Sequence, residues 1–582
     1  MMRTKKGATG LALGAVVALA AAACSSGGTS GGGSAATSSS AAPQKGGTLY
    51  MLNLGPHNGL DPQQSYVGAD LEFAARAYAR SLVTYSVGKD SKLVPDLATD
   101  TGTMTDGGKT WKFTLVDNAK WQDGQAVKCD DVKYGISRTF ATDVISNGPT
   151  YILQYLDVPS AADGSSTYKG PYSGAGQADF DKAITCDGQT LTLHMKTPWA
   201  DFNQAAASLA AYSPVRKDKD KGDKSLFDVF SNGPYMLDPS TPFDANKGGT
   251  WVRNPNWDES TDKVRKAYPD KIVDVEGIQS EQIYQRLLAD GGDDKTAMTF
   301  TSAPPSLLPQ IASNPAAASR TIATDAPYVD YVQPNVTSEV MKDPKVRQAF
   351  AMATNRDAYV TANGGPQVMT PTYSICNPQL KCYSNGFNPF GAPTAGDPAG
   401  AKKVLQDAGK TLPVPVTVVY RKTATRDNAF AALKQTWDQA GFNVTLEGIT
   451  DKYYRTISSA AQKGKDAFYA SWGADWPSGS TDLPPLFDGR VNITATSSNQ
   501  DYGYYNSDAV NKAIDAAYLI PDADAREKAW GAIDQQICKD GGVIPLVSQK
   551  FTFVNGSNIQ GATVNPQFGG YIDLATISLK SS

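Results

Sequence analysis

The stretch 414–472 constrains the fold more than any other part of the sequence, because strand-like and helix-like patterns alternate along it. We expect a strand, a helix, a strand, a helix and a strand at 414–420, 425–440, 442–449, 452–462 and 467–472. Gly441 directly follows the first helix and suits its C-terminal cap. Alternation at this spacing predicts an α/β fold with a parallel sheet covered by helices.

The rest of the body is less regular. Residues 141–182 and 213–250 are rich in Gly, Ser, Asp and Pro and are expected to form long surface loops. Further strands are expected at 46–54, 111–116 and 190–196, and further helices at 67–83, after Asp130-Asp131, and at 345–360, 398–409, 507–518 and 523–539. The final stretch begins at Val543, and we find no internal repeat.

The first 23 residues have the pattern of a secretory signal peptide. Arg3, Lys5 and Lys6 precede an uncharged run from Leu11 to Ala23, which is shorter than the roughly 20 residues of a spanning helix. The run ends in Ala-Ala-Ala-Cys24, which resembles a bacterial lipobox, although Ala21 stands where the motif usually has Leu. We expect a lipid on Cys24. The alternative is an ordinary Ala-x-Ala signal in which Cys24 is incidental.

Residues 24–44 are expected to form a flexible tether between the lipidated cysteine and the folded body. After Cys24 they are Gly, Ser, Ala and Thr with no apolar periodicity, up to the Pro-Gln at the end. No later run is apolar and long enough to span a membrane, so we expect a soluble body. This arrangement predicts a protein held by two acyl chains at the outer face of the cell membrane.

Charge argues against a nucleic-acid partner. The 582-residue chain has a formal charge of −4, and removal of Arg3, Lys5 and Lys6 with the signal peptide makes the mature chain more negative by three. The isoelectric point is near 5.5 and there is no basic run.

Five of the six cysteines follow Cys24, and disulfides are expected outside the cell. Spacing alone leaves their connectivity open. We favour the pairs Cys129–Cys186 and Cys376–Cys382. Cys538 falls in the apolar pattern of a helix, where a free cysteine acts as a small hydrophobic residue.

The sequence contains no complete motif for catalysis. The chain has only two histidines, His57 and His194, which lie far apart in the sequence. The match to G-x-S-x-G at 28–32 lies in the tether, not on a strand-to-helix turn. The cysteines show no zinc spacing. The sequence therefore predicts no enzyme, no metal and no cofactor.

A long motif suggests a family. Residues 106–140 read DGGKTWKFTLVDNAKWQDGQAVKCDDVKYGISRTF, which resembles the signature of the extracellular solute-binding proteins of dipeptide and oligopeptide ABC importers, known as family 5. The segments at 231–235, 343–356, 424–449 and 469–477 agree in order with further family motifs. At the first of these, Ser231 replaces a family glycine. The likeness covers essentially the whole mature chain.

The resemblance implies a two-lobed clamshell of the periplasmic-binding-protein class II, with an extra domain on the first lobe. The first lobe would be built from three stretches, 45–80, 232–335 and 546–582. The extra domain would be 81–231, and the second lobe 336–545.

The resemblance also implies a binding site. In peptide-binding relatives, the aspartate that matches Asp475 holds the α-amino group of the peptide. Backbone groups near Ser471, Trp472 and Gly473 would bond the peptide main chain, and Trp472 or Trp476 could wall a side-chain pocket. The alternative is that Asp475 only forms a strand-end turn and bonds local backbone N–H groups. After Asp475, Trp476-Pro477 departs from many relatives, so the pocket wall can differ.

We expect a monomer that captures di- and oligopeptides and delivers them to an ABC importer permease with a cytoplasmic ATPase. Three alternatives remain: the same fold binding an oligosaccharide or another small solute, a receptor for a peptide signal, and an extracellular hydrolase.

Overall fold

The computed structural model describes residues 42–162 and 164–580, so the signal segment, Cys24 and nearly all of the tether lie outside the described residues. The strands expected around 414–472 form β14 (Val414–Arg421), β15 (Phe442–Ile449) and β16 (Ala467–Gly473). β14 pairs in parallel with β15 and with β16, which confirms a parallel sheet here. α12 (Ala424–Gln439) connects the first two, and Gly441 follows its end at φ +93°.

The complete six-stranded sheet is mixed rather than parallel. Its order is β13-β17-β12-β16-β14-β15, and β12 (Thr321–Pro334) runs antiparallel to both β16 and β17 (Ile544–Val554). β13 (Met369–Pro371) adds to the outer edge of β17. Only the parallel half was predicted from the sequence, because the pairing direction of strands far apart in the chain leaves no trace in periodicity. We call this sheet and its helices the second lobe.

A five-stranded sheet forms the centre of the first lobe. Its order is β11-β1-β10-β9-β8, with β1 parallel to both neighbours and β8–β10 antiparallel. The strands are β1 (Thr48–Leu52), β8 (Tyr235–Leu237), β9 (Gly248–Arg253), β10 (Lys271–Val275) and β11 (Ala297–Met298). The sheet therefore draws its strands from separate stretches of the chain, as a discontinuous lobe requires.

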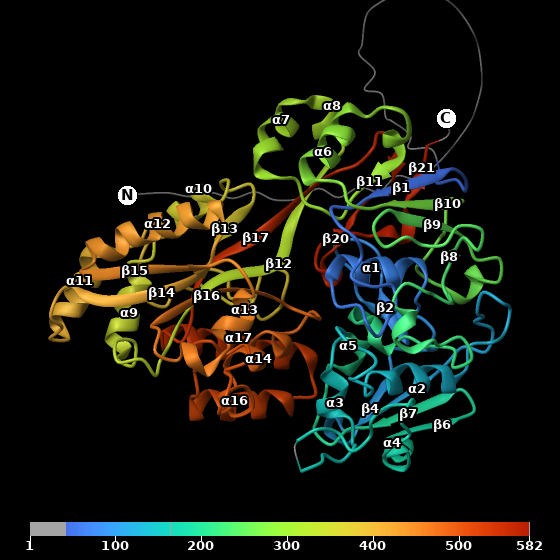
Figure 1. The fold of residues 1–582 in the computed structure, drawn as a ribbon, viewed down its shortest axis with the longest axis horizontal. Helices are drawn as coiled ribbons and strands as arrows, with labels where there is room; N and C mark the ends of the chain where they lie inside the picture. The colour runs from blue at the N-terminus through green and yellow to red at the C-terminus, as the bar shows by residue number, and fades with distance from the viewer. Residues whose placement is uncertain (1–41, 163, 581–582) are drawn as a thin grey trace, which may run out of the picture. The chain divides into compact units, whose positions relative to one another are not determined.

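β12 and β17 take part in both lobes (Figure 1). From Thr321 to Asp325, β12 pairs with β17 alone, and from Tyr328 onward it also pairs with β16. Their register shifts between Asp325 and Val329. The lobe boundaries expected from the sequence lie near the second-lobe ends of these strands, at 335/336 and at 545/546. The division into lobes remains a proposal, and we place the point where β12 and β17 pass from one lobe to the other at the register shift.

Residues 81–231 contain a separate four-stranded antiparallel sheet of order β4-β5-β7-β6. Its strands are β4 (Thr103–Thr105), β5 (Thr110–Thr114), β6 (Ile184–Asp187) and β7 (Thr190–His194). A disulfide joins Cys129, at the start of α2 (Cys129–Arg138), to Cys186 on β6. Trp111 and Trp121 are buried in its core.

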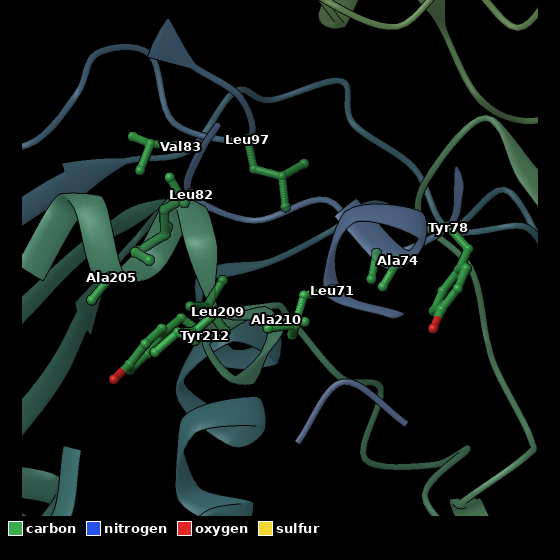
Figure 2. Close-up of a cluster of buried hydrophobic side chains, with 14 of the residues drawn as sticks. Leu71, Ala74, Tyr78, Leu82, Val83, Leu97, Ala205, Leu209, Ala210 and Tyr212 are labelled. Carbon is green, nitrogen blue, oxygen red and sulfur yellow. The ribbon is translucent and has the colours of Figure 1, made fainter. Parts of the chain in front are cut away.

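One apolar cluster contains residues of this sheet and of the first lobe. Figure 2 shows part of that cluster. Leu71 and Ala74 of α1 (Gly68–Ala77) belong to the same core as Leu82 and Val83, which lie in or beside β2 (Val83–Tyr85). The other residues labelled in Figure 2 are Tyr78, Leu97, Ala205, Leu209, Ala210 and Tyr212. Ala205 lies on α5 (Phe202–Ser208).

The remaining elements cover these sheets. In the first lobe and the 81–231 region they are β3 (Leu93–Pro95), α3 (Tyr151–Tyr155), α4 (Gln177–Ala183), α6 (Ser280–Ala289), α7 (Leu308–Ser313), α8 (Pro315–Ala318), β18 (Ile559–Gln560), β19 (Val564–Asn565), β20 (Tyr571–Ile572) and β21 (Ser578–Leu579). In the second lobe they are α9 (Pro344–Met352), α10 (Arg356–Ala362), α11 (Pro398–Asp407), α13 (Tyr453–Ile457), α14 (Leu483–Phe487), α15 (Gly489–Asn492), α16 (Asp508–Tyr518) and α17 (Ala523–Lys539).

Some expectations were wrong in detail: the helix expected at 67–83 ends at Ala77, and Val83 starts β2. The helix expected at 345–360 is two helices, because the Asn355 side chain accepts a hydrogen bond from the Ala358 N–H and starts α10 there. The stretches expected as loops contain α3, α4 and β8, which are too short to show a period.

Cys376 is bonded to Cys382, and Cys538 is a buried free thiol on α17. None of the helices in the described ranges is both long and apolar enough to cross a membrane.

Candidate functional site

A cavity of about 370 Å³ lies at the carboxyl end of β16. Ligands of open α/β sheets bind beyond the carboxyl ends of their strands. Ser471, Trp472, Gly473 and Asp475, four of the five residues expected to bind substrate, line this cavity. The other lining residues are Tyr66, Val67, Gly68, Leu71, Ser208, Pro327, Tyr328, Ala474, Gln567, Phe568, Gly569 and Tyr571.

Asp475 lies just beyond β16, and two tyrosine hydroxyls from outside the second lobe donate to its carboxylate. The Tyr66 hydroxyl lies 2.5 Å from Asp475 Oδ2, and the Tyr151 hydroxyl donates to the same oxygen. The Asp475 backbone N–H donates to Thr481 Oγ1 at 3.1 Å. The carboxylate is therefore held by distant tyrosines rather than by the local backbone that the turn alternative requires.

Burial raises the pKa of Asp475, while hydrogen bonds from Tyr151, Tyr66 and Thr481 act to lower it. Burial and the neighbouring Asp475 carboxylate raise the pKa of Tyr66, so that hydroxyl stays protonated and can donate. None of the described lining residues is Lys, Arg or His. A cation from outside the protein would therefore find a partly desolvated carboxylate with no cationic side chain in the surrounding wall.

The end of β16 also exposes a strand edge. On one side, Tyr328, Val329 and Asp330 of β12 pair with Gly473, Trp472 and Ser471. On the other side, β14 pairs with β16 only at Ala467 and Phe468. Within the described chain, residues 471–473 thus have a strand partner on one side only. Such an edge can accept an extended peptide by main-chain hydrogen bonds.

The two tryptophans expected to wall the pocket take different positions. Trp472 lines the cavity, and its indole N–H donates to the Thr481 carbonyl oxygen at 3.1 Å. Trp476 is only 3% exposed and is not a lining residue. Its ring packs edge-on against Tyr151, with centroids 4.8 Å apart, and its indole N–H donates to Ser480 Oγ. Trp476 therefore packs against the 81–231 region and does not form the pocket wall.

Several site residues were missed by sequence reasoning. Tyr66 precedes α1, Tyr151 lies on α3, Tyr328 lies on β12 and Phe568 lies near the C-terminus. They come from stretches far apart in the chain, and each sits in a segment without a diagnostic motif. Only their aromatic character could have suggested a role.

One further group could hold a metal ion. Ligand atoms of His57, Asp274 and Glu276 lie within 4.8 Å of one another. His57 Nε2 lies 2.8 Å from Asp274 Oδ2, and Nδ1 lies 2.6 Å from Asp70 Oδ1. Burial acts to lower the pKa of His57, but the hydrogen bonds to Asp274 and Asp70 outweigh it and raise that pKa well above its usual value. The distances suit a protonated imidazole that donates from both nitrogens, so the contacts need no metal to account for them.

Comparison with family models decides the class of protein. Residues 92–493 match the model described as "Bacterial extracellular solute-binding proteins, family 5 Middle", which is more than half of the chain. The chain belongs to this family. The resemblance inferred from residues 106–140 is therefore confirmed, and family 5 membership makes the chain an extracellular solute-binding protein of bacterial type.

Curated relatives match this family 5 protein over most of its length. The periplasmic oligopeptide-binding protein OppA of Salmonella typhimurium is 25% identical over 485 residues, which cover 80% of this chain and 79% of OppA. The glutathione-binding protein GsiB of Salmonella typhi is 24% identical over 505 residues, which cover 85% of this chain and 88% of GsiB.

Solved structures share the fold of this family 5 protein. "Clavulanic acid biosynthesis oligopeptide binding protein 2" superposes with a TM-score of 0.83 at 25% identity, covering 92% of this chain and 96% of the other. The murein tripeptide binding protein MppA of Escherichia coli gives a TM-score of 0.67 at 20% identity, covering 92% and 99%. These neighbours confirm the expected two-lobed class with its extra domain.

Proposed function

We propose that this protein is an extracytoplasmic lipoprotein that captures peptides and delivers them to an ABC importer. One observation carries the proposal: the carboxylate of Asp475 and residues 471–473 of β16, which have a strand partner on one side only, line one cavity. A peptide amine would form a charge-assisted hydrogen bond with Asp475, and the peptide main chain would pair with the strand edge. Main-chain pairing does not depend on side-chain identity, which suits a general peptide carrier.

The relatives support a peptide ligand. OppA is named for oligopeptides, GsiB for the tripeptide-like glutathione and MppA for a murein tripeptide. Ser208 and Ser471 line the described cavity, but their hydroxyls bond to Tyr85 and Gln549 and not to a carboxylate or a histidine, so we propose binding without turnover. The partners would be a membrane permease and its cytoplasmic ATPase, and the protein would act as a monomer.

The anchor is part of the proposal. A lipid on Cys24 would hold the protein at the outer face of the cell membrane, with the tether at 24–44 leaving the body free to meet a permease. Metabolic labelling with a palmitate analogue tests this. Label on the wild-type chain and none on Cys24→Ser supports the anchor, and equal labelling of both contradicts it.

An oligosaccharide is the second candidate, because Trp472 and four other aromatic residues line the cavity and flat rings also suit sugars. Thermal unfolding of the Cys24→Ser protein separates the two ligands. At one hundred times its dissociation constant, a ligand stabilises a protein by about 2.7 kcal/mol, which shifts the midpoint by a few degrees. We expect shifts with peptides of two to six residues and none with maltotriose. Shifts with sugars alone would keep the fold and replace the ligand.

Delivery to an importer needs its own test. Cells lacking this protein should lose uptake of a labelled peptide that the purified protein binds, and the restored gene should return it. Unchanged uptake together with a lost peptide-dependent cellular response would instead support the receptor alternative.

A further inference from the structure

The cavity at the end of β16 is electrostatically one-sided. Asp475 is the single charged residue among the described residues that line it. Behind the wall, Asp330 pairs with Ser471 in the β12–β16 register and is 1% exposed. Its carboxylate accepts hydrogen bonds from the Tyr359 hydroxyl at 2.9 Å and from the Gln549 amide at 2.8 Å. Asp475 therefore favours positive charge in the cavity, whereas Asp330 lies behind the wall and interacts with Arg426.

The uncharged residues of the cavity wall also favour a cation. Tyr66, Tyr328, Trp472, Phe568 and Tyr571 contribute aromatic rings to the lining. The faces of aromatic rings attract cations, and this attraction grows where water is excluded. A carboxylate that enters the cavity loses its hydration and finds neither a cationic side chain nor a favourable contact with a ring face.

A short unmodified peptide carries one charge of each sign. Its amine has a partner in Asp475. Its C-terminal carboxylate would have to bond to neutral groups of the wall, such as Ser208 and Gln567. When an ion leaves water and meets no counter-charge, most of its desolvation free energy is not offset. The wall therefore accommodates the amine end of a peptide and opposes the carboxylate end.

We propose that the part of the ligand held in this cavity is a net cation, with a free amine and no carboxylate. This inference rests on the proposed peptide-binding function and names the ligand class more narrowly. Two kinds of molecule share that chemistry. One is a short peptide whose C-terminus is amidated, and the other is a longer peptide whose carboxylate lies in water beyond the cavity.

Peptide length separates these two sources. An extended chain rises roughly 3.3 Å per residue, so a tripeptide spans about 10 Å and a hexapeptide about 20 Å. A cavity of about 370 Å³ is at the small end for ligand sites. A tripeptide amine at Asp475 thus keeps its C-terminus inside, whereas a hexapeptide extends past the wall. The charge of the C-terminus should matter for the first and not for the second.

Arg426 is the basic residue to test as a partner for the peptide carboxylate. Its guanidinium lies over the ring of Tyr469 on β16, 5.0 Å from the centroid, and it is not a lining residue. Burial acts to lower the pKa of Arg426, but Tyr469, Tyr359 and Asp330 outweigh it and raise that pKa, so the Arg426 charge is already directed toward protein groups. Were it nevertheless the partner of a peptide carboxylate, an Arg426→Gln variant would bind acids less well and amides equally well.

The experiment is isothermal titration of the full-length Cys24→Ser chain with trialanine, trialanine amide, N-acetyl trialanine amide, hexaalanine and hexaalanine amide. We expect the tripeptide amide to bind at least tenfold more tightly than the acid, and the acetylated amide to show no binding. The acid and amide of the hexapeptide should differ by less than twofold.

A charge introduced into the wall provides the matched variant. Gln567→Lys should bring the tripeptide acid to parity with its amide, whereas Gln567→Met, which changes shape without adding charge, should leave the ratio as in the wild type. Equal ratios in the two variants would contradict the inference, because an added cation would then not reach the peptide carboxylate.

The outcomes separate this inference from the proposed function. Tripeptide acids that bind as tightly as amides, or acid binding that depends on Arg426, overturn the cationic-ligand inference and leave peptide capture intact. Equal binding of acetylated and free amides also overturns it, because the ligand would then not be recognised as a cation. If no peptide of either length binds in any form, peptide capture itself is wrong.

Discussion

The Tyr66 hydroxyl donates to the carboxylate of Asp475 across 2.5 Å, although 409 positions separate the two residues in the chain. Tyr66 belongs to the loop before α1 in the first lobe, and Asp475 to the end of β16 in the second. Tyr151, from the 81–231 region, donates to the same oxygen. A single carboxylate thus lines the candidate ligand cavity and joins the parts of the protein that surround it.

Replacement of Asp475 by asparagine should weaken peptide binding by about 10- to 100-fold. A charge-assisted hydrogen bond contributes about 1.5–3 kcal/mol, and the amide keeps the shape of the side chain while removing its charge. Titration calorimetry with a peptide amide measures the loss. Asp451→Asn, at an exposed position outside the cavity, is the control and should bind normally. Unchanged affinity in Asp475→Asn would remove this residue from the site.

Peptide affinity should fall on acidification at a higher pH than an ordinary aspartate would give. The ionised form of Asp475 binds a cation, so affinity is lost as pH falls through its pKa, and burial raises that pKa above the usual value of about 4. The Tyr151 hydroxyl acts to lower the same pKa. Tyr151→Phe should therefore move the loss of affinity to a still higher pH.

Dissociation constants measured from pH 4 to 8 test this prediction. Phenylalanine retains the ring that packs against Trp476, so the variant removes the hydroxyl alone. Tyr383→Phe serves as the control, since Tyr383 is not a lining residue. A pH profile that is the same in all three proteins would show that the Tyr151 hydroxyl does not lower the pKa of the group that governs binding.

Local sequence predicted the strands of 414–472 and the strand end that carries Asp475. It did not predict the lining residues that come from distant parts of the chain. The period of 414–472 located β14, β15 and β16 to within a residue or two, and the motif at 469–477 pointed to the strand end that carries Asp475. Trp476 looked equally suitable for the pocket, because sequence shows that a side chain is aromatic but not which way it faces. In the structure it is buried against Tyr151.

Long-range pairing explains the remaining differences. Tyr66, Tyr328 and Phe568 reach one cavity only because β12 and β17 connect the lobes, and no periodic pattern encodes which distant strands pair. His57 was likewise unremarkable in the sequence. Its three acidic neighbours come from α1 and from the end of β10, more than 200 positions away for Asp274.

A second contact between the parts of the protein should stabilise the arrangement in which Asp475 meets the tyrosines. Asp201, in the 81–231 region, accepts hydrogen bonds from Ser478 at 2.9 Å and Ser480 at 2.7 Å, and forms an ion pair of 2.6 Å with Arg526. Asp201 and Arg526 are each 3% exposed. Breaking a buried pair by removing one partner costs about 3–5 kcal/mol when the other charge stays buried.

Asp201→Asn should therefore weaken peptide affinity even though Asp201 does not line the cavity. It should also increase the radius of gyration measured by small-angle X-ray scattering, because Arg526 can regain water when the lobes separate. Asp187→Asn, an exposed position at the end of β6 in the same region, should change neither quantity. Lower affinity at an unchanged radius would mean that Asp201 acts through local packing instead.

The buried imidazole of His57 should make stability depend on pH with a sign opposite to that of a paired aspartate. Hydrogen bonds to Asp274 and Asp70 hold the folded-state pKa well above the value near 6.5 expected in the unfolded chain. The protonated form therefore stabilises the folded state fully below about pH 6.5, and this contribution is lost as pH rises through the folded-state pKa. His57→Gln should cost about 3–5 kcal/mol at pH 6, because it leaves buried carboxylates without their cation.

Urea unfolding at pH 6 and at pH 9–10 measures the difference between His57→Gln and the wild type, which should shrink at the higher pH. His194→Gln replaces the other histidine of the chain, on β7, and should leave stability within about 0.5 kcal/mol at every pH. A gap that stays constant with pH would mean that His57 stabilises the fold by packing against Phe73, 5.6 Å away between ring centroids, rather than by its charge.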